Sequence, residues 1–201
     1  MRSVYDFIIS PKDSRYINTK KVGGKDLILN TEIYNHQYVS RNAIVKSTPI
    51  MVDTEIQPGD EVIVHHNVFR RWLDVKGIER NSKSYIDENT YCIKQDQMFS
   101  YKRNNKWLPV EGYCFVKPIE SDDEISVGSE KELVGVIKQV DTKLKEFGIK
   151  ENDLVGFIPN SEYEFIIDGE RLYRVLSNHI SIKYEYQGNE KEYNPSWASS
   201  S

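Results

Sequence analysis

The sequence has little sulfur, no excess of positive charge and no long apolar run. Its 201 residues include only two cysteines, Cys92 and Cys114, without the CxxC spacing of metal or redox motifs, so we expect buried thiols in a reducing cytoplasm. A formal charge of −4 argues against nucleic acid as the main partner, because phosphate binding is driven by a basic excess. No segment approaches the roughly 18 apolar residues of a membrane span, and the N-terminus does not have the pattern of a signal peptide. We therefore expect a cytoplasmic protein that binds neither membrane nor nucleic acid.

The sequence also lacks the motifs of common catalytic and metal sites. No GxGxxG, P-loop, GxSxG or HExxH pattern occurs. His65 and His66 are adjacent, so on a strand they would face opposite sides and would not chelate one ion together. The acidic clusters SDDE and DEN are typical of solvated turns and have no nearby His or Lys with an acid–base role. We predict a protein that is not an enzyme and that holds no metal and no cofactor.

What the sequence does contain is a series of short alternating runs. YDFIIS, DEVIVHH, LVGFIP and LYRVL are examples, each rich in Val, Ile, Tyr or Phe and bounded by Pro, Gly, Asn or Asp. Such runs are typical of strands separated by turns. Signals for helices are sparse. The pattern predicts an all-β protein, with a barrel or sandwich favoured by the even strand spacing.

The two halves of the chain repeat four blocks in the same order. The pairs are IISP (8–11) with FVKP (115–118), AIVK (43–46) with GVIK (135–138), QPGDEVIVHHN (57–67) with KENDLVGFIPN (150–160), and YCIKQDQMFSYK (91–102) with YRVLSNHISIKY (173–184). One match alone is weak, but four in register order predict two homologous small β-barrels in tandem. We expect a first barrel over 1–108, a second over 109–187 and a polar tail over 188–201.

The first half carries two insertions that the second half lacks. Pro11 and Ile44 are 33 positions apart, whereas Pro118 and the matching Val136 are 18 apart. The extra residues fall in a long loop at about 17–38. The second insertion, VFRRWLDVKGIERNSKS (68–84), is basic and aromatic.

The order of these blocks resembles that of the GroES-type co-chaperonins, the small ring proteins that cap the bacterial chaperonin. The segments that carry the resemblance in the first half are RNAIVKS (41–47), QPGDEVIV (57–64) and YIDENTYCIKQDQMF (85–99), with a long glycine-containing loop before them. In the second half they are LVGVIKQV, IKENDLVGF and IIDGERLYRVLSNHI. The resemblance covers about 180 residues of the chain and implies two tandem GroES-like barrels, the first with a mobile loop.

The resemblance also implies a partner and a site. In the family, a mobile loop ends in an aliphatic tripeptide that docks on the chaperonin, and GGKDLIL places Leu27, Ile28 and Leu29 at that position, after the hinge glycines Gly23 and Gly24. The implied function is a co-chaperonin that closes a GroEL-type chaperonin in its ATP-dependent cycle. The implied assembly is a homo-oligomeric ring, by resemblance sevenfold, over a chamber that holds unfolded client proteins. The one-loop tandem form looks similar to a phage-encoded version, which would act in the host cytoplasm.

Other interpretations of these segments stay open on sequence alone. The aliphatic triplet is also compatible with a buried strand of the first barrel. Phe69, Arg70, Arg71 and Trp72 in the second insertion are compatible with a contact surface between subunits or toward the chamber, with a nucleic-acid patch, or with a plain solvated hairpin. The tail is compatible with a frayed end or with a clip onto a neighbouring subunit. The alternative function is a structural or adaptor protein, for example a virion component, that reuses the barrel without chaperonin contact.

Overall fold

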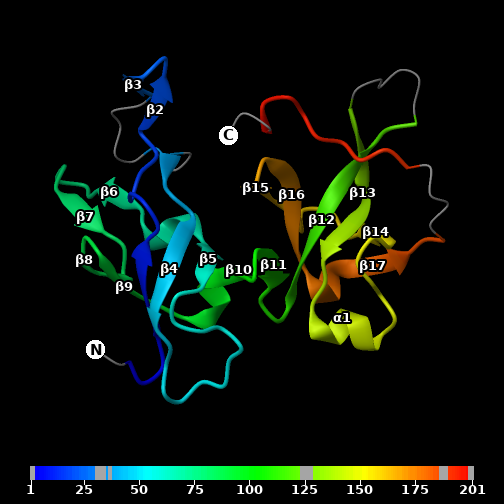
Figure 1. Ribbon diagram of the computed structural model, residues 1–201, viewed down its shortest axis with the longest axis horizontal. Coiled ribbons are helices and arrows are strands. Elements are labelled where there is room, and N and C mark those ends of the chain that lie inside the picture. The colour runs from blue at the N-terminus through cyan, green and yellow to red at the C-terminus, as the bar shows by residue number, and fades with distance from the viewer. Residues whose placement is uncertain (1–2, 30–34, 36–37, 123–128, 186–189, 199–201) are drawn as a thin grey trace. The chain divides into compact units, whose positions relative to one another are not determined.

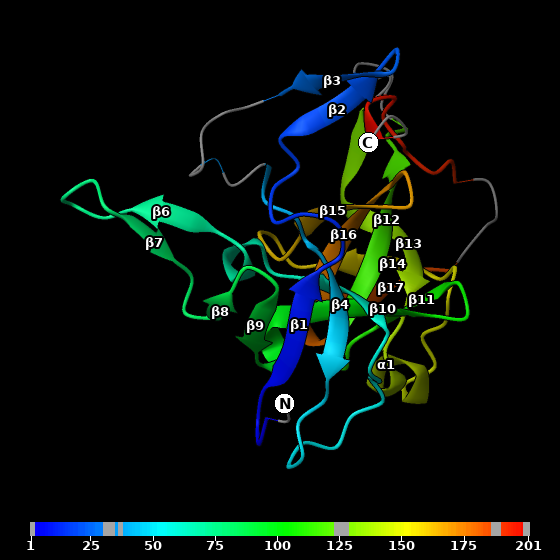
Figure 2. The same cartoon turned by 60° about the vertical axis from the view of Figure 1, so that its left-hand side comes forward.

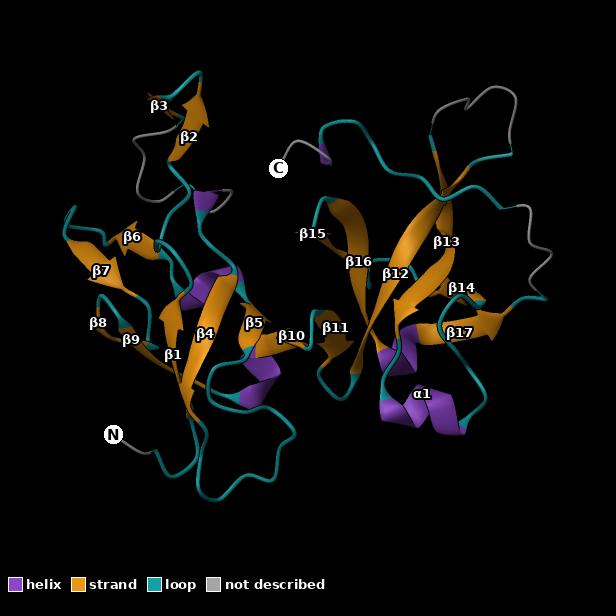
Figure 3. Ribbon diagram, in the orientation of Figure 1, coloured by secondary structure: helices purple, strands orange, loops and turns teal. Residues whose placement is uncertain are grey.

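The computed structural model describes residues 3–29, 35, 38–122, 129–185 and 190–198 (Figure 1). The chain divides into two compact units, Met1–Lys106 and Trp107–Ser201, which we call the first and the second unit. Strands account for 48% of the described residues and helices for 9%. Figure 3 shows the strands in orange and the helices in purple. The prediction of an all-β protein is confirmed. Among the described residues no sheet closes on itself, so the two barrels stay a prediction.

The first unit is built on one antiparallel sheet with two small hairpins added to it. The sheet strands are β1 (Phe7–Pro11), β4 (Asn42–Ser47), β5 (Glu61–Val64), β8 (Tyr85–Asp87), β9 (Thr90–Ile93) and β10 (Met98–Arg103), continued at the junction by β11 (Lys106–Pro109). The hairpins are β2 (Thr19–Val22) with β3 (Lys25–Ile28), and β6 (Arg71–Leu73) with β7 (Glu79–Asn81). Short 3-10 turns lie at His66–Val68 and Gln95–Gln97.

The second unit is a six-stranded antiparallel sheet with one short helix. Its strands are β12 (Tyr113–Glu120), β13 (Glu130–Gln139), β14 (Leu154–Phe157), β15 (Tyr163–Ile167), β16 (Glu170–Leu176) and β17 (Ile180–Lys183). Helix α1 (Thr142–Glu146) lies between β13 and β14, and a 3-10 turn at Ser177–His179 precedes β17. Asp141 caps α1 by accepting a hydrogen bond from the Leu144 N–H, at 2.9 Å.

The two sheets have the same strand order. In the first unit the order is β10-β5-β4-β1-β9-β8, and in the second it is β17-β14-β13-β12-β16-β15. Each strand of one list occupies the place of its sequence-repeat partner in the other. The repeat that the sequence predicts therefore has a counterpart in the topology.

The repeat extends to irregularities of the strand register. The pairing of β1 with β4 shifts between Ile8 and Ile9, and the pairing of β12 with β13 shifts between Phe115 and Val116, the matching positions. A bulge is an extra residue that bends a strand, and its position is not fixed by hydrophobic alternation. The register thus shifts at positions that the sequence repeat pairs with each other, which agrees with the shared strand order.

The turn before the third repeated strand is also the same in both units. Asp60 and Asp153 each accept, through their carboxylate, the backbone N–H three residues earlier, at 2.8 and 2.7 Å. The residue before each Asp has a positive φ, 96° at Gly59 and 71° at Asn152. Glycine and asparagine are the residues that tolerate this left-handed conformation, which explains why PGD and END are equivalent here.

Each unit buries its own core. In the first unit the largest fully buried side chains include Phe7, Ile9, Phe69, Tyr91 and Met98. The second unit has two separate apolar clusters. The smaller one is formed by Ile119, Val136 and Leu154. The main cluster comprises Cys114, Val116, Ile137, Val140, Leu144, Val155, Phe157 and Val175. The alternating runs of the sequence are thus the strands that supply these cores.

The two thiols lie in different surroundings, and this gives a first prediction. Both are free; Cys114 is buried and Cys92 is partly exposed. Burial raises the pKa of the Cys114 thiol to about 12, and burial raises that of Cys92 by less. Because the thiolate is the reactive form, we expect one slowly reacting thiol per native chain at pH 8 and the second only after denaturation. Thiol titration with an aromatic disulfide reagent measures this, with Cys92→Ser as the control that removes the native signal. Two thiols reacting at one rate in the native protein would contradict it.

Candidate functional site

The first insertion contains a tight β-hairpin. β2 pairs antiparallel with β3, with Val22 opposite Lys25, so that Gly23 and Gly24 form a two-residue turn. Both glycines have positive φ, 58° and 79°. Two consecutive left-handed residues define the type I′ turn, whose twist matches that of the flanking strands, and Gly-Gly is a preferred sequence for it. The glycine pair, predicted as a hinge, is therefore the turn of a hairpin.

Leu27 and Ile28 of the aliphatic triplet lie on β3, and Leu29 follows it directly. The exposed fractions of Leu27, Ile28 and Leu29 are 54%, 66% and 40%. Successive residues of a strand point to opposite faces. Because Leu27 and Ile28 are both more than half exposed, the described residues cover neither face of the two-stranded ribbon at this point. The three side chains are thus outside the core of the first unit. Residues 30–34 and 36–37 of the predicted loop lie outside the described residues.

The two ends of the insertion meet at its base. Tyr16 and Val39 form an isolated antiparallel bridge, and the Ile17 N–H donates to the Tyr38 carbonyl at 2.7 Å. Beside them the Ser40 N–H donates to the Arg15 carbonyl at 3.1 Å. The hairpin therefore leaves the sheet and returns to it at one place. Figure 2 shows β2 and β3 at one end of the first unit, beyond β1 and β4.

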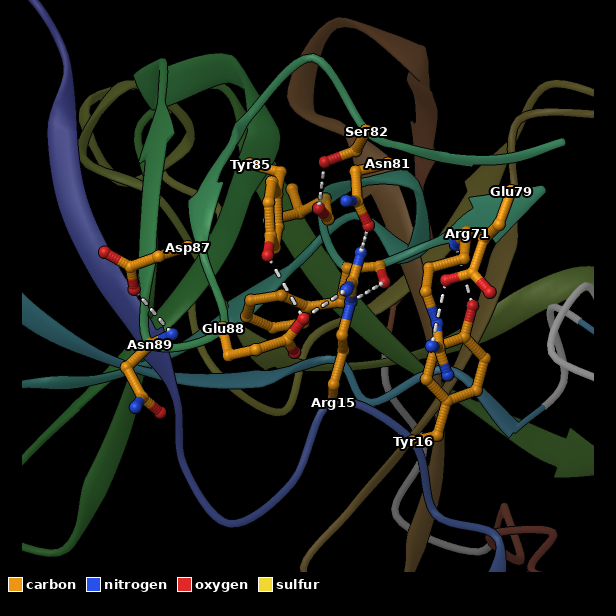
Figure 4. Close-up of polar contacts among 12 residues, drawn as sticks. Arg15, Tyr16, Arg71, Glu79, Asn81, Ser82, Tyr85, Asp87, Glu88 and Asn89 are labelled. Carbon is orange, nitrogen blue, oxygen red and sulfur yellow. Dashed lines mark hydrogen bonds and ion pairs between the residues drawn. The ribbon is translucent and has the colours of Figure 1, made fainter.

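A buried arginine fixes the chain where the first insertion begins (Figure 4). The Arg15 guanidinium donates to the Phe69 carbonyl at 2.8 Å and to Asn81 Oδ1 at 2.6 Å, and it pairs with Glu88 at 3.4 Å. It also lies 4.9 Å from the centroid of the Tyr85 ring. Phe69 precedes β6 and Asn81 is the last residue of β7, so Arg15 connects the base of one insertion to the base of the other.

Tyr16 makes a second connection between the two insertions. Its hydroxyl accepts a hydrogen bond from the Arg71 N–H at 2.7 Å, and the Arg71 guanidinium lies 5.1 Å from the centroid of its ring. Arg71 in turn pairs with Glu79 across the β6–β7 hairpin at 3.0 Å. No sequence motif marks Arg15 or Tyr16 as a functional residue. The sequence shows that Arg15 and Tyr16 lie next to the first insertion. It does not show their hydrogen-bond partners, because these lie more than fifty residues away along the chain.

The second insertion folds as a hairpin with an apolar surface. Trp72 and Leu73 of β6 and Val75 and Ile78 of the turn are all exposed, Val75 completely. Asp74 closes the turn by accepting the N–H groups of the second and fourth residues after it, each at 2.9 Å. These hydrogen bonds, with that of Ile78 the largest cause, lower the pKa of the Asp74 carboxyl. Figure 2 shows β6 and β7 projecting away from β8 and β9.

Three of the four predicted surface residues of this insertion do reach the surface of the first unit. Trp72 is exposed and Arg70 and Arg71 are partly exposed. Phe69 was placed with them wrongly: none of its surface is exposed, and its ring packs edge-on against Tyr91 at a centroid distance of 4.7 Å. Phe69 is at the end of the insertion next to the sheet, where an aromatic side chain completes the core.

The C-terminal segment returns to its own unit. Glu192 forms a bridge with Ile119, the Tyr193 N–H donates to the Pro118 carbonyl at 2.8 Å, and Ala198 is fully buried. Lys117, which is almost completely buried, pairs with Glu170 at 3.1 Å and with Glu192 at 3.8 Å. Up to residue 198, apart from 186–189, the tail is thus part of the second unit.

The structure offers no arrangement for metal chemistry within the residues that it describes. No group of three or more His, Cys, Asp or Glu side chains is placed to hold an ion there. The expectation that His65 and His66 face opposite sides was wrong, because β5 ends at Val64 and a 3-10 turn follows, so that the two rings stack at 4.3 Å. His65 Nδ1 accepts the Asn67 N–H at 3.1 Å, so this nitrogen is already used. None of the helices among the described residues has the length and apolar character needed to cross a membrane.

The chain was compared with models of known protein families and with curated protein sequences. Neither comparison finds a match.

Proposed function

We propose that this protein is a co-chaperonin: a ring of GroES-like subunits that caps a GroEL-type chaperonin in its ATP-dependent cycle and docks through Leu27, Ile28 and Leu29. One observation carries the proposal. The three aliphatic side chains are exposed on the β2–β3 hairpin, whereas the matching stretch of the second half, between Pro118 and Val136, is about 15 residues shorter in sequence and has no aliphatic triplet. The fold does not need this segment, and water is an unfavourable environment for it, so a partner is the simplest reason for its presence.

The energetics agree with docking by several weak arms. Burying three aliphatic side chains is worth about 5–9 kcal/mol in total. Ordering a flexible loop costs about 1–2 kcal/mol per residue, but here Gly23 and Gly24 already define the hairpin turn, which reduces that cost. One arm alone still binds weakly once the loss of overall motion is subtracted. In a ring, each later arm binds at a high effective concentration, so the ring binds firmly while single arms can release.

The experiment is a pull-down of GroEL-type chaperonin in the presence of ATP, with Leu27, Ile28 and Leu29 changed together to Ser. We expect the triple variant to lose binding by at least about a hundredfold, because most of the buried apolar surface of each arm is removed. The matched control is Ile50→Ser with Met51→Ser, which removes exposed apolar side chains of the first unit that lie outside both hairpins.

Two outcomes oppose the proposal. If the triple variant bound chaperonin as well as the unchanged protein, the β2–β3 hairpin would have no role in docking. A protein that assembles but ignores chaperonin with or without ATP would favour the structural or adaptor function instead. The cytoplasmic location, and the host cytoplasm for a phage-encoded form, belong to the same proposal.

A further inference from the structure

The two units carry charges of opposite sign. The first unit, residues 1–106, has 17 Lys and Arg against 13 Asp and Glu, a formal charge of +4. The second, residues 107–201, has 10 against 18, a formal charge of −8. The chain total of −4 hides this asymmetry. Charges of one sign on each unit make two like units of different copies repel and two unlike units attract.

We propose that copies of this chain bind one another head to tail, with the β6–β7 hairpin of one copy placed against the acidic second unit of the next. The inference rests on the ring of the proposed function and adds how its subunits meet, but it does not depend on chaperonin contact. The occupant of the hairpin surface is therefore a second copy of the same chain.

The hairpin has the composition of an interface. Trp72, Leu73, Val75 and Ile78 are exposed on a two-stranded ribbon, and a ribbon of this kind is only marginally stable without a surface to pack on. Arg15 and Tyr16 hold it at its base only, through Phe69, Arg71 and Asn81. An apolar centre with a tryptophan and a charged rim is the usual anatomy of a protein–protein contact.

The charges left over on the hairpin are positive. Arg71 pairs with Glu79 and Arg80 pairs with Asp74, which neutralises both acidic residues of the segment. Lys76 and Lys83 are exposed and have no ion pair within the described part of the chain. The rim is thus basic, and its complement is an acidic surface. The second unit, at −8, is the acidic part of the same chain.

The difference between the two units explains why this contact joins two different surfaces rather than two copies of one surface. The second unit has the same sheet, and its described residues between β14 and β15 form no equivalent of the β6–β7 hairpin, so each copy offers one such hairpin and one acidic unit. A contact between two different surfaces is heterologous, and repeating it produces a ring when the rotation closes. A symmetric pairing of two hairpins would place like charges together, which disfavours it.

The first test uses the unchanged protein alone and needs no variant. Native mass measurement and sedimentation at 50 mM and 1 M NaCl compare two screening conditions, because the Debye length falls to about 3 Å at 1 M. We expect assembly at low salt and a shift toward the 23.5 kDa chain at high salt. A protein that is monomeric at both salt concentrations, or an assembly that is insensitive to salt, would overturn the inference.

The second test assigns the contact to the hairpin. Lys76→Glu with Lys83→Glu is expected to raise the dissociation constant of the assembly at least about tenfold. The matched control, Lys46→Glu with Lys94→Glu, makes the same change of net charge at two other exposed lysines of the first unit. If the hairpin variant assembled as well as the unchanged protein, or if the control variant weakened assembly equally, the hairpin would not be part of the contact. Circular dichroism of both variants checks that they are folded.

Cross-linking identifies the surface on the other side. A carbodiimide joins lysines to carboxylates in contact, and mixed isotope-labelled and unlabelled chains separate links between copies from links within one. We expect links between copies from Lys76 or Lys83 to carboxylates of residues 107–201. Links between copies that lie only within residues 1–106 would overturn the head-to-tail arrangement. The triplet variant of Leu27, Ile28 and Leu29 is expected to assemble normally, so loss of chaperonin binding and loss of assembly are separate results.

Discussion

Replacing Arg15 by Met is expected to lower the free energy of unfolding of the first unit by about 3–5 kcal/mol. The side chain is buried and its guanidinium makes charge-assisted hydrogen bonds to the Phe69 carbonyl and to Asn81 Oδ1. Hydrogen bonds to charged groups are worth about 1.5–3 kcal/mol each, and their loss leaves a buried carbonyl without this donor. The exposed partner, Glu88, contributes little, because a solvated ion pair is worth about 0–1 kcal/mol.

Hydrogen exchange measured by mass spectrometry during urea unfolding separates the two units and is therefore the suitable measurement. The loss is expected in the first unit, with the second unchanged. Glu88→Gln is the matched control and is expected to cost less than about 1 kcal/mol. Arg15→Lys tests the geometry, since a lysine keeps the charge but lacks the planar fork that reaches two acceptors at once. A full rescue by Lys would show that charge alone, and not the fork, holds the two insertions together.

Replacing Gly135 by Ala is expected to destabilise the second unit by about 1–3 kcal/mol or more. A Cβ at this position would overlap the Lys117 carbonyl oxygen and would lie 2.6 Å from Val116 Cγ1. The carbonyl belongs to the backbone of β12, which pairs with β13 at this point, so no change of rotamer relieves the overlap. The strands themselves must separate, and their hydrogen bonds weaken.

The duplicated fold supplies an internal control for this prediction. Ala43 occupies the same register position in the first unit: it is opposite Pro11, as Gly135 is opposite Pro118. The reverse change, Ala43→Gly, removes a buried methyl group and is expected to cost the first unit about 0.5–1 kcal/mol through backbone freedom. Urea unfolding followed by exchange in each unit compares the two variants. A smaller effect of Gly135→Ala than of Ala43→Gly would contradict the close approach of β12 and β13.

The repeat was predictable from sequence because its determinants are local. Asp60 and Asp153 each mark a turn by bonding to the chain three residues away, and the strands that follow alternate in a visible way. The strand order then follows from the order of the blocks. The bulge at Ile8 and Ile9 was not visible, because it depends on how β1 pairs with Ser47 and Val45 of β4, which come more than thirty residues later in the chain.

The site was only partly predictable for the same reason. Leu27, Ile28 and Leu29 stand out as an apolar triplet in a polar segment, and the repeat shows that the second half lacks them. Glycine permits both a flexible joint and a tight turn. The pairing of Val22 with Lys25 places Gly23 and Gly24 in a hairpin turn, and their role as a hinge stays a prediction. The bridge between Tyr16 and Val39 closes the base of the β2–β3 hairpin. No local sequence pattern predicts such a pairing between residues far apart in the chain.

The bridge between Tyr16 and Val39 places the two ends of the first insertion one strand spacing apart, about 5 Å. An excursion that starts and stops at one point transmits little strain to what lies beneath it. Evolution can lengthen, shorten or exchange such a segment while β1 and β4 keep their pairing, so that the sequence of the segment and the stability of the sheet can change independently.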